Sequence, residues 1–243
     1  MTKKQLFWIR AFLLSFYPYS LIAGFFWGFL AHNIPPFPAS MPAEELAQYF
    51  RDNAFRMRLG YGVSLPFWSM LMVWAVGAFC VMRRVEKGDT PWSFIQLMGG
   101  SFNTVVMSVA AGFWVTAAMR PETDPKIIQM LYDVGWLEGD LFNGVAMLQN
   151  LSLFMVFYRD DRPVRLVPKW ALWFGVFLSL SYSLEMLLPF FRSGPFGWGG
   201  LINYGVGFCT PFVWMIIMTF YLQKAAVTLY NESQAEAAQA ARG

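Results

Sequence analysis

The stretch Ile127–Tyr158, IIQMLYDVGWLEGDLFNGVAMLQNLSLFMVFY, is apolar and long enough to cross a lipid bilayer as a helix. Several acids and amides lie within this stretch, namely Asp133, Glu138, Asp140, Asn143, Gln149 and Asn150. A charged residue at the centre of a membrane helix costs about 2.5–3.5 kcal/mol on insertion scales, so such residues usually have a specific role. The stretch therefore predicts a membrane helix that also holds a polar site.

The composition of the whole chain is that of a polytopic membrane protein. Of its 243 residues, 57% are hydrophobic and only 14% are charged, whereas an average soluble domain has about 25% charged residues. The apolar residues gather in long runs, and the basic residues lie in short loops between them, so the net charge of +3 does not indicate a nucleic-acid partner. Cys80 and Cys209 fall inside two of these runs, which argues against a structural disulfide.

Six membrane spans can be counted, and they predict an all-α bundle. Residues 1–230 would form one transmembrane domain and residues 231–243 a tail. The first run lacks a small-residue cleavage site and is long enough to span, so we expect an anchor rather than a cleaved signal peptide. The predicted spans are approximately Ala11–Ala31, Tyr61–Met82, Trp92–Met119, Ile127–Tyr158, Trp170–Phe191 and Tyr204–Gln223.

The distribution of Lys and Arg predicts that both termini are cytoplasmic. With this orientation, twelve of the eighteen basic residues lie on the inner side, including Lys3, Arg83 and Arg159. The outer side holds the remaining six, which are Arg51, Arg56, Arg58, Arg120, Lys126 and Arg192.

Two outer loops have features of their own. The loop His32–Gly60 has helical apolar spacing after Ser40, a potential helix cap, and predicts an amphipathic interfacial helix. This helix would either cover the mouth of the bundle or lie against lipid. The loop Arg192–Asn203 is rich in glycine and predicts an irregular segment, with Phe196 and Trp198 as interfacial anchors.

The fourth span predicts a polar stripe. At 100° per residue, Asp133 and Asp140 nearly eclipse one another, and Asn143 and Asn150 follow within an arc of about 100°. Asp140 and Asn143 fall near the middle of the span, and Asp133 falls near its outer end. The stripe would either join helices by hydrogen bonds or line a cavity for a ligand, a proton or an ion.

The third span offers partners for that stripe. Gln96, Gly100 and Asn103 share one face, and Asn103 falls at the depth of Asp140 and Asn143. The short connection between the two spans makes them neighbours, so we expect Asn103, Asp140 and Asn143 to form a cluster.

Glu138 and Glu185 are the other acids of interest. Glu138 lies on a separate face of the fourth span, where Gly135 and Gly139 form a Gly-x-x-x-Gly pair that permits close helix contact. Glu185, in the fifth span, either pairs with Arg192 across the outer mouth or joins Glu138, Asp133 and His32 around an outward-opening pocket.

Several classes of protein are excluded by what the chain lacks. No lysine falls within a span, so there is no Schiff-base site for retinal, and the single histidine, His32, cannot ligate haem on both axial sides. The sequence has no Cys-x-x-Cys pair, phosphate-binding glycine loop or zinc-protease motif. We expect no cofactor and no metal, although Asp133, Glu138, Asp140, Glu185 and His32 would be the ligands of a divalent ion, which their spacing does not specify.

The apolar residues suggest what a site could accept. The chain has 25 Phe, 11 Trp and 15 Met, which could line an adaptable cavity for a small lipophilic molecule. Pro18, Pro66 and Pro211 each fall inside a span and would kink it, which would widen the bundle locally.

Three functions follow from these observations. The first is a polar, carboxylate-lined pocket that binds or passes a small, largely apolar molecule, with Asn103, Asp140 and Asn143 in contact with it. Gln96 would contribute to this pocket, and Glu138 and Glu185 would gate or protonate at its outer side. The second is an integral-membrane enzyme with Asp140 and Glu185 as acid and base. The third is a non-catalytic subunit whose stripe meets a membrane-protein partner or a second copy of the chain.

The segment Pro189–Gly199, PFFRSGPFGWG, resembles a group of uncharacterised bacterial polytopic membrane proteins with a Gly-Pro-Phe-x-Trp loop before their last helix. Gly199 and Gly200 stand where the group usually has a second polar residue in the loop. The resemblance implies a helical bundle in a bacterial inner membrane, and it implies no function.

Overall fold

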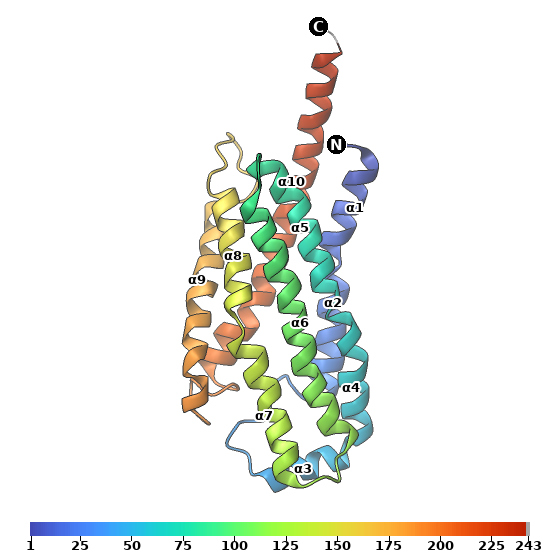
Figure 1. Cartoon of the computed structure of the whole chain (residues 1–243), viewed down its shortest axis with the longest axis vertical. Coiled ribbons are helices and arrows are strands. Elements are labelled where there is room, and N and C mark those ends of the chain that lie inside the picture. Colours follow the sequence, from blue (N-terminus) through green and yellow to red (C-terminus); the bar gives the residue numbers. More distant parts are fainter. Residues whose placement is uncertain (242–243) are drawn as a thin grey trace.

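The computed structural model describes residues 1–241 (Figure 1). Most of it consists of six helices that are long and apolar enough to cross a membrane. The chain is therefore a multi-pass membrane protein, and the predicted number of spans is confirmed. The spans cover Lys3–Leu30, Ala54–Glu86, Pro91–Met119, Pro125–Phe157, Lys169–Phe190 and Leu201–Ala240.

Only the third span is a single α-helix, α6 (Pro91–Met119); the other five change helix type or break partway. The first three elements are α1 (Lys3–Leu14), α2 (Phe16–Ile22) and the π-helix η1 (Ala23–Leu30). The next helices are α3 (Ala43–Asp52), α4 (Ala54–Phe67), α5 (Met70–Glu86), α7 (Pro125–Leu141) and α8 (Gly144–Phe157). The last are α9 (Lys169–Tyr182), the 3₁₀-helix η2 (Ser183–Phe190), the π-helix η3 (Leu201–Cys209) and α10 (Thr210–Ala240).

Prolines lie at three of the interruptions, as the sequence predicts. A proline ring displaces the carbonyl four residues earlier and donates no hydrogen bond. Pro18 stands four residues after Leu14, at which α1 ends. Pro66 is the second-last residue of α4, and Pro211 lies in the first turn of α10, directly after η3.

The fourth span corrects the expectation of one continuous helix, because Phe142 and Asn143 separate α7 from α8. Asn143 and the following Gly144 are both weak helix formers. The Asn143 side chain also donates a hydrogen bond to the backbone carbonyl of Tyr182, 2.8 Å away on the fifth span. A tertiary contact thus stabilises the interruption.

Small residues let α6 pack closely at the centre of the bundle, where it contacts α4, α5, α7 and α8. A Cβ atom on Gly99 would lie 2.6 Å from the Val145 carbonyl oxygen of α8, which is too close for any side chain. The predicted Gly135 and Gly139 pair also faces α6. A Cβ on Gly135 would overlap the Trp114 indole, and one on Gly139 would lie 3.7 Å from Met107 Cε.

The helix α3 lies at the end of the bundle opposite the termini (Figure 1). The predicted amphipathic helix is confirmed, although Pro42 rather than Ser40 precedes its first turn. Leu46 and Phe50 are buried, and the Phe50 ring lies 6.1 Å from that of Tyr132 on α7. This contact shows that α3 covers part of the bundle end.

The loop before the last span also folds inward. Trp198 is only 5% exposed, so it is not the interfacial anchor that the sequence predicts. Its indole Nε1 donates to the Phe37 carbonyl oxygen at 2.7 Å, and its ring stacks on Trp136 with centroids 6.5 Å apart. An indole that finds both an acceptor and an aromatic partner is better placed inside the protein than at its surface.

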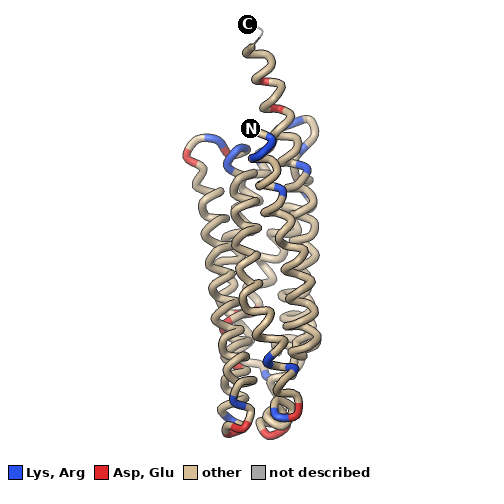
Figure 2. The backbone as a smooth tube through the Cα atoms, turned by 90° about the vertical axis from the view of Figure 1, so that its right-hand side faces the viewer, with Lys and Arg blue, Asp and Glu red and all other residues tan. Residues whose placement is uncertain are grey.

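Both termini lie at the same end of the bundle, and Figure 2 shows Lys and Arg at both ends but few between them. The Met1 amino group donates to Ser233 Oγ at 3.0 Å, and Arg10 Nε donates to Gln223 Oε1 at 2.8 Å. These contacts join the N-terminal segment to α10, which continues the sixth span as far as Ala240.

Candidate functional site

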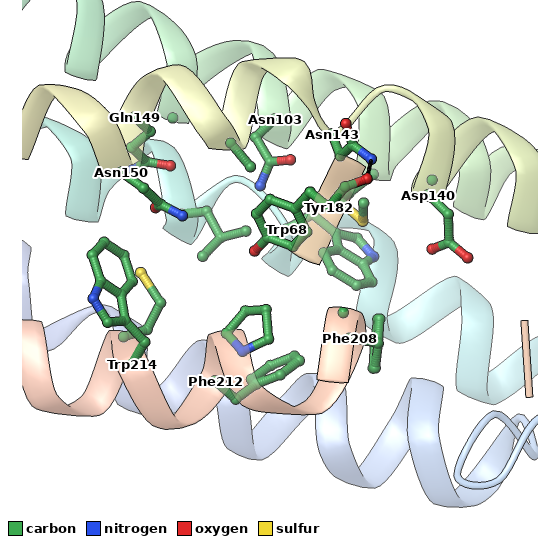
Figure 3. A pocket seen from close by; sticks show the side chains of 18 of the residues that line it. Trp68, Asn103, Asp140, Asn143, Gln149, Asn150, Tyr182, Phe208, Phe212 and Trp214 are labelled. Carbon is green, nitrogen blue, oxygen red and sulfur yellow. Dashed lines mark hydrogen bonds between the residues drawn. The ribbon is translucent and has the colours of Figure 1, made fainter. Parts of the chain in front are cut away.

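A cavity with a volume of about 130 Å³ lies inside the bundle where the interrupted spans meet (Figure 3). All six spans contribute to its wall. Its lining residues include Phe16, Tyr19, Trp68, Leu71, Asn103, Met107, Asp140, Asn143, Gln149, Asn150, Tyr182, Glu185, Gly207, Phe208, Phe212 and Trp214.

The cavity lies at the level of the helix interruptions. Phe16 directly follows the break between α1 and α2, and Trp68 directly follows the end of α4. Asn143 lies in the break between α7 and α8, and Tyr182 is the last residue of α9. Phe208 lies near the junction of η3 with α10. Irregular backbone is tolerated at membrane depth where it is buried in protein or lines a polar cavity, so the interruptions and the cavity belong together.

Asp140 is held by a residue that the sequence did not single out. Asn203 Nδ2, on η3, donates to Asp140 Oδ2 at 2.9 Å, and Asn203 is only 4% exposed. The predicted sixth span begins at Tyr204, which places Asn203 in the loop before it. An amide at the start of an apolar run was the only available signal.

Glu185 is held by the break in the fourth span. Asn143 Nδ2 donates to Glu185 Oε2 at 2.8 Å, in addition to its bond to the Tyr182 carbonyl. Gly207 of η3 lies directly against the carboxyl group, because a Cβ atom on Gly207 would overlap Glu185 Oε1. Glu185, on the fifth span, therefore lies between the fourth and the sixth spans.

Amides line the opposite end of the cavity. Figure 3 shows Asp140 at one end and Gln149, Asn150 and Trp214 at the other, with Asn103 and Trp68 between them. Trp68 Nε1 is buried and has no hydrogen-bond acceptor among the described residues.

The structure brings together four of the six residues predicted to bind a ligand. Asn103, Asp140, Asn143 and Glu185 all line the cavity. Gln96 and Glu138 do not. Gln96 is fully buried elsewhere on α6, and neither its oxygen nor its nitrogen has a hydrogen-bond partner within residues 1–241.

The other suggested partners of Glu185 lie away from it. Asp133 and His32 are not part of the cavity wall. The His32 ring stacks on Phe37 with centroids 4.5 Å apart, and burial together with the charge of Arg56 lowers the pKa of His32. Arg192 is exposed, and the part of the chain described contains no ion pair between Arg192 and Glu185. The outer mouth is therefore not closed by that pair.

A second hollow, at the end with the termini, is built from charged residues that already have partners. Glu86 accepts hydrogen bonds from the N–H groups of Trp92 and Ser93, each at 2.9 Å, at the start of α6. Arg162 Nη1 lies 2.7 Å from Asp160 Oδ1, and its Nε lies 3.0 Å from Glu232 Oε1 on α10. These hydrogen bonds and ion pairs give each of the charged side chains a structural role.

Asp160 is the best-defined of these groups. It is buried, which by itself would raise the pKa of Asp160, but hydrogen bonds from the Leu166 N–H and from Arg162 outweigh burial and lower that pKa below its usual value. The Leu166 N–H lies 2.8 Å from Asp160 Oδ2. The ionised carboxylate therefore organises the loop between α8 and α9.

The chemistry of the membrane cavity is thus defined by two carboxyl groups, several amides and many aromatic rings. Lys, Arg and His are absent from its described lining. Residues 1–241 contain no group of three or more His, Cys, Asp or Glu side chains placed to hold a metal ion. Comparison with known proteins finds no family model, curated protein or solved structure that matches this chain.

Proposed function

We propose that this protein binds a small, largely apolar molecule in its intramembrane cavity and passes it through the bilayer. Asp140, Asn143 and Asn103 would be its polar contacts, and Glu185 would contribute the second acid. The observation that supports this proposal best is the convergence of five helix interruptions on one cavity lined by both acids.

The interruptions bear on function because they are costly in a membrane. Each break frees backbone groups that a regular helix would pair, and lipid cannot hydrogen-bond them. Membrane transporters use such discontinuous helices at midplane binding sites, where the freed groups and helix ends face the ligand. If the six spans met only through apolar contacts between helices, five interruptions would serve no purpose. Around a binding cavity, the interruptions supply polar groups and hinges.

We infer the cytoplasmic orientation of the termini from the charge distribution. Lys and Arg lie at both ends of the bundle, but twelve of the eighteen belong to the side that holds both termini, and in bacterial inner membranes the side richer in these residues faces the cytoplasm (Figure 2). A C-terminal fusion to alkaline phosphatase should be inactive, and a fusion to green fluorescent protein should fluoresce. The reverse pattern would place the termini outside.

The first test of the binding function looks for a bound molecule. Protein purified in mild detergent should carry a defined small apolar compound, detected by mass spectrometry of an organic extract. Repeated extracts that contain only bulk lipid and detergent would count against the proposal.

A pair of variants connects that compound to the cavity. Ala146→Phe places a ring into the cavity from α8 and should abolish retention of the compound. Gly112→Phe introduces a Phe side chain on α6 at a position where a Cβ atom meets nothing within 4 Å, and this variant should retain the compound. Equal retention by both variants would show that the compound binds elsewhere.

A second function, acid–base catalysis on a lipophilic substrate, is favoured by one observation. The two acids considered as catalytic, Asp140 and Glu185, line the same cavity, and each is held by an amide. An enzyme would release a molecule chemically different from the one it takes up. Mass spectra of the extract before and after incubation of the protein with the retained compound would show such a change.

A further inference from the structure

We propose that the ligand of the intramembrane cavity is an organic cation, whose ammonium group lies beside Asp140 and Glu185 while its apolar body lies among the aromatic rings. This inference rests on the proposed binding function of the same cavity, and it names the class of molecule bound. Two features of the cavity support it: the sign of the charged groups in its wall and the aromatic rings beside them.

The charge balance of the cavity is one-sided. Asp140 and Glu185 both line it, and within the described chain no basic side chain does so. The other titratable groups in the wall are the hydroxyls of Tyr19 and Tyr182, which carry no positive charge. An anionic ligand would be repelled by an ionised carboxylate, whereas a cation would supply the positive charge that the protein omits.

The hydrogen bonds of the two acids leave room for that cation. Asn203 donates to Oδ2 of Asp140, and Asn143 donates to Oε2 of Glu185. No hydrogen bond from the described residues reaches Oδ1 of Asp140 or Oε1 of Glu185. Each acid is thus oriented through one oxygen and keeps the other available. A charge that is buried in a membrane protein is normally paired, and no basic side chain of the described chain lines the cavity to pair with either acid.

The aromatic wall suits a quaternary or protonated amine. Tyr19 lies between Trp68 and Phe212, with ring centroids 5.6 Å and 6.3 Å away, and Phe208 lies 5.6 Å from Phe212. All four rings line the cavity. The negative face of an aromatic ring attracts a cation within about 6 Å of its centroid, and several rings together form a cage for alkylammonium groups.

Two probes of the same shape separate charge from apolar fit. Benzyltrimethylammonium carries a permanent charge that does not titrate, and 2,2-dimethylpropylbenzene is its neutral isostere. Isothermal titration calorimetry on the full-length protein in detergent should show the cation binding about tenfold more tightly or better. Equal binding, or tighter binding of the neutral probe, would overturn the inference.

Variants then assign the charge to the two acids. Asp140→Asn and Glu185→Gln keep the side-chain shape and should each weaken binding of benzyltrimethylammonium by about tenfold, with little change for the neutral probe. Asp133→Asn makes the same change on α7 outside the cavity and should bind both probes like the parent protein. Variants that remain folded and bind the cation normally would contradict the proposal.

The probes also distinguish failure of this inference from failure of the proposed function. Binding of the neutral probe alone, lost in Ala146→Phe, would support an apolar pocket and reject the cation. Binding of neither probe, together with an extract free of any retained compound, would reject both. The comparison of probes on the parent protein does not depend on whether a variant folds.

Discussion

Asn143 Nδ2 lies 2.8 Å from Glu185 Oε2 and so joins the break in the fourth span to the 3₁₀ segment of the fifth. The same nitrogen lies 2.8 Å from the Tyr182 carbonyl oxygen at the end of α9. One amide therefore satisfies a side chain and a backbone group at two helix interruptions. The contact explains why both interruptions occur at the same level, next to the cavity.

We predict that Asn143→Ala destabilises the protein by about 1–3 kcal/mol, because it leaves a buried acid and a freed carbonyl without their donor. The measurement is thermal unfolding of the purified protein in detergent. Glu185→Gln should cost less by itself, since its amide oxygen can still accept from Asn143.

A double-mutant cycle isolates the contact. If Asn143 acts through Glu185, the losses of unfolding free energy caused by Asn143→Ala and by Glu185→Ala, which removes the acceptor, should not add, and the coupling should be about 0.6–2 kcal/mol. Additive effects in the double variant would show that Asn143 stabilises the fold through Tyr182 alone.

Gly207→Ala should reduce ligand binding while the protein still folds. The new methyl group would overlap Glu185 Oε1, so the carboxyl group must move away from its position at the cavity. The measurement is the affinity for benzyltrimethylammonium. Gly205→Ala on the same π-helix is the matched control, because its Cβ atom would lie 3.2 Å from the flexible Leu201 side chain. Equal effects of the two variants would indicate a general disturbance of η3.

Asp160→Asn should destabilise the protein in a pH-dependent way. Because hydrogen bonds lower the pKa of Asp160 in the folded state, its stabilising contribution is complete well above the unfolded pKa of about 3.9 and is lost as the pH falls through the folded pKa. Melting temperatures of the parent and the variant should therefore differ most near neutral pH and converge in acid. A difference that is constant from neutral to acidic pH would show that the ionised carboxylate is not responsible.

The membrane architecture could be predicted from local sequence. Apolar runs of sufficient length determine where helices cross, and Pro18, Pro66 and Pro211 mark three interruptions, because the constraint imposed by proline depends on its own ring and the preceding turn. The close approach of Gly135 and Gly139 to α6 follows from their spacing on one helix face.

The candidate site was only partly predictable. Helical periodicity placed Asp140, Asn143 and Asn103 at one depth, and all three line the cavity. Periodicity could not identify Asn203 as the donor to Asp140, because the two residues are 63 positions apart and their contact depends on how the fourth and sixth spans pack. Nor could periodicity predict that Trp198 is buried, because its indole donates to the Phe37 carbonyl oxygen, which is far away in the sequence.

The sequence by itself determined that six apolar helices cross a membrane and that acids lie among them, because hydropathy and residue spacing act within one helix. Only the tertiary structure decided that Asp140 and Glu185 share a cavity, that Asn143 breaks its helix, and that Gln96 and Glu138 stay outside the cavity. Those outcomes depend on the rotation and depth of each helix relative to its neighbours, which are set by packing between residues far apart in the chain.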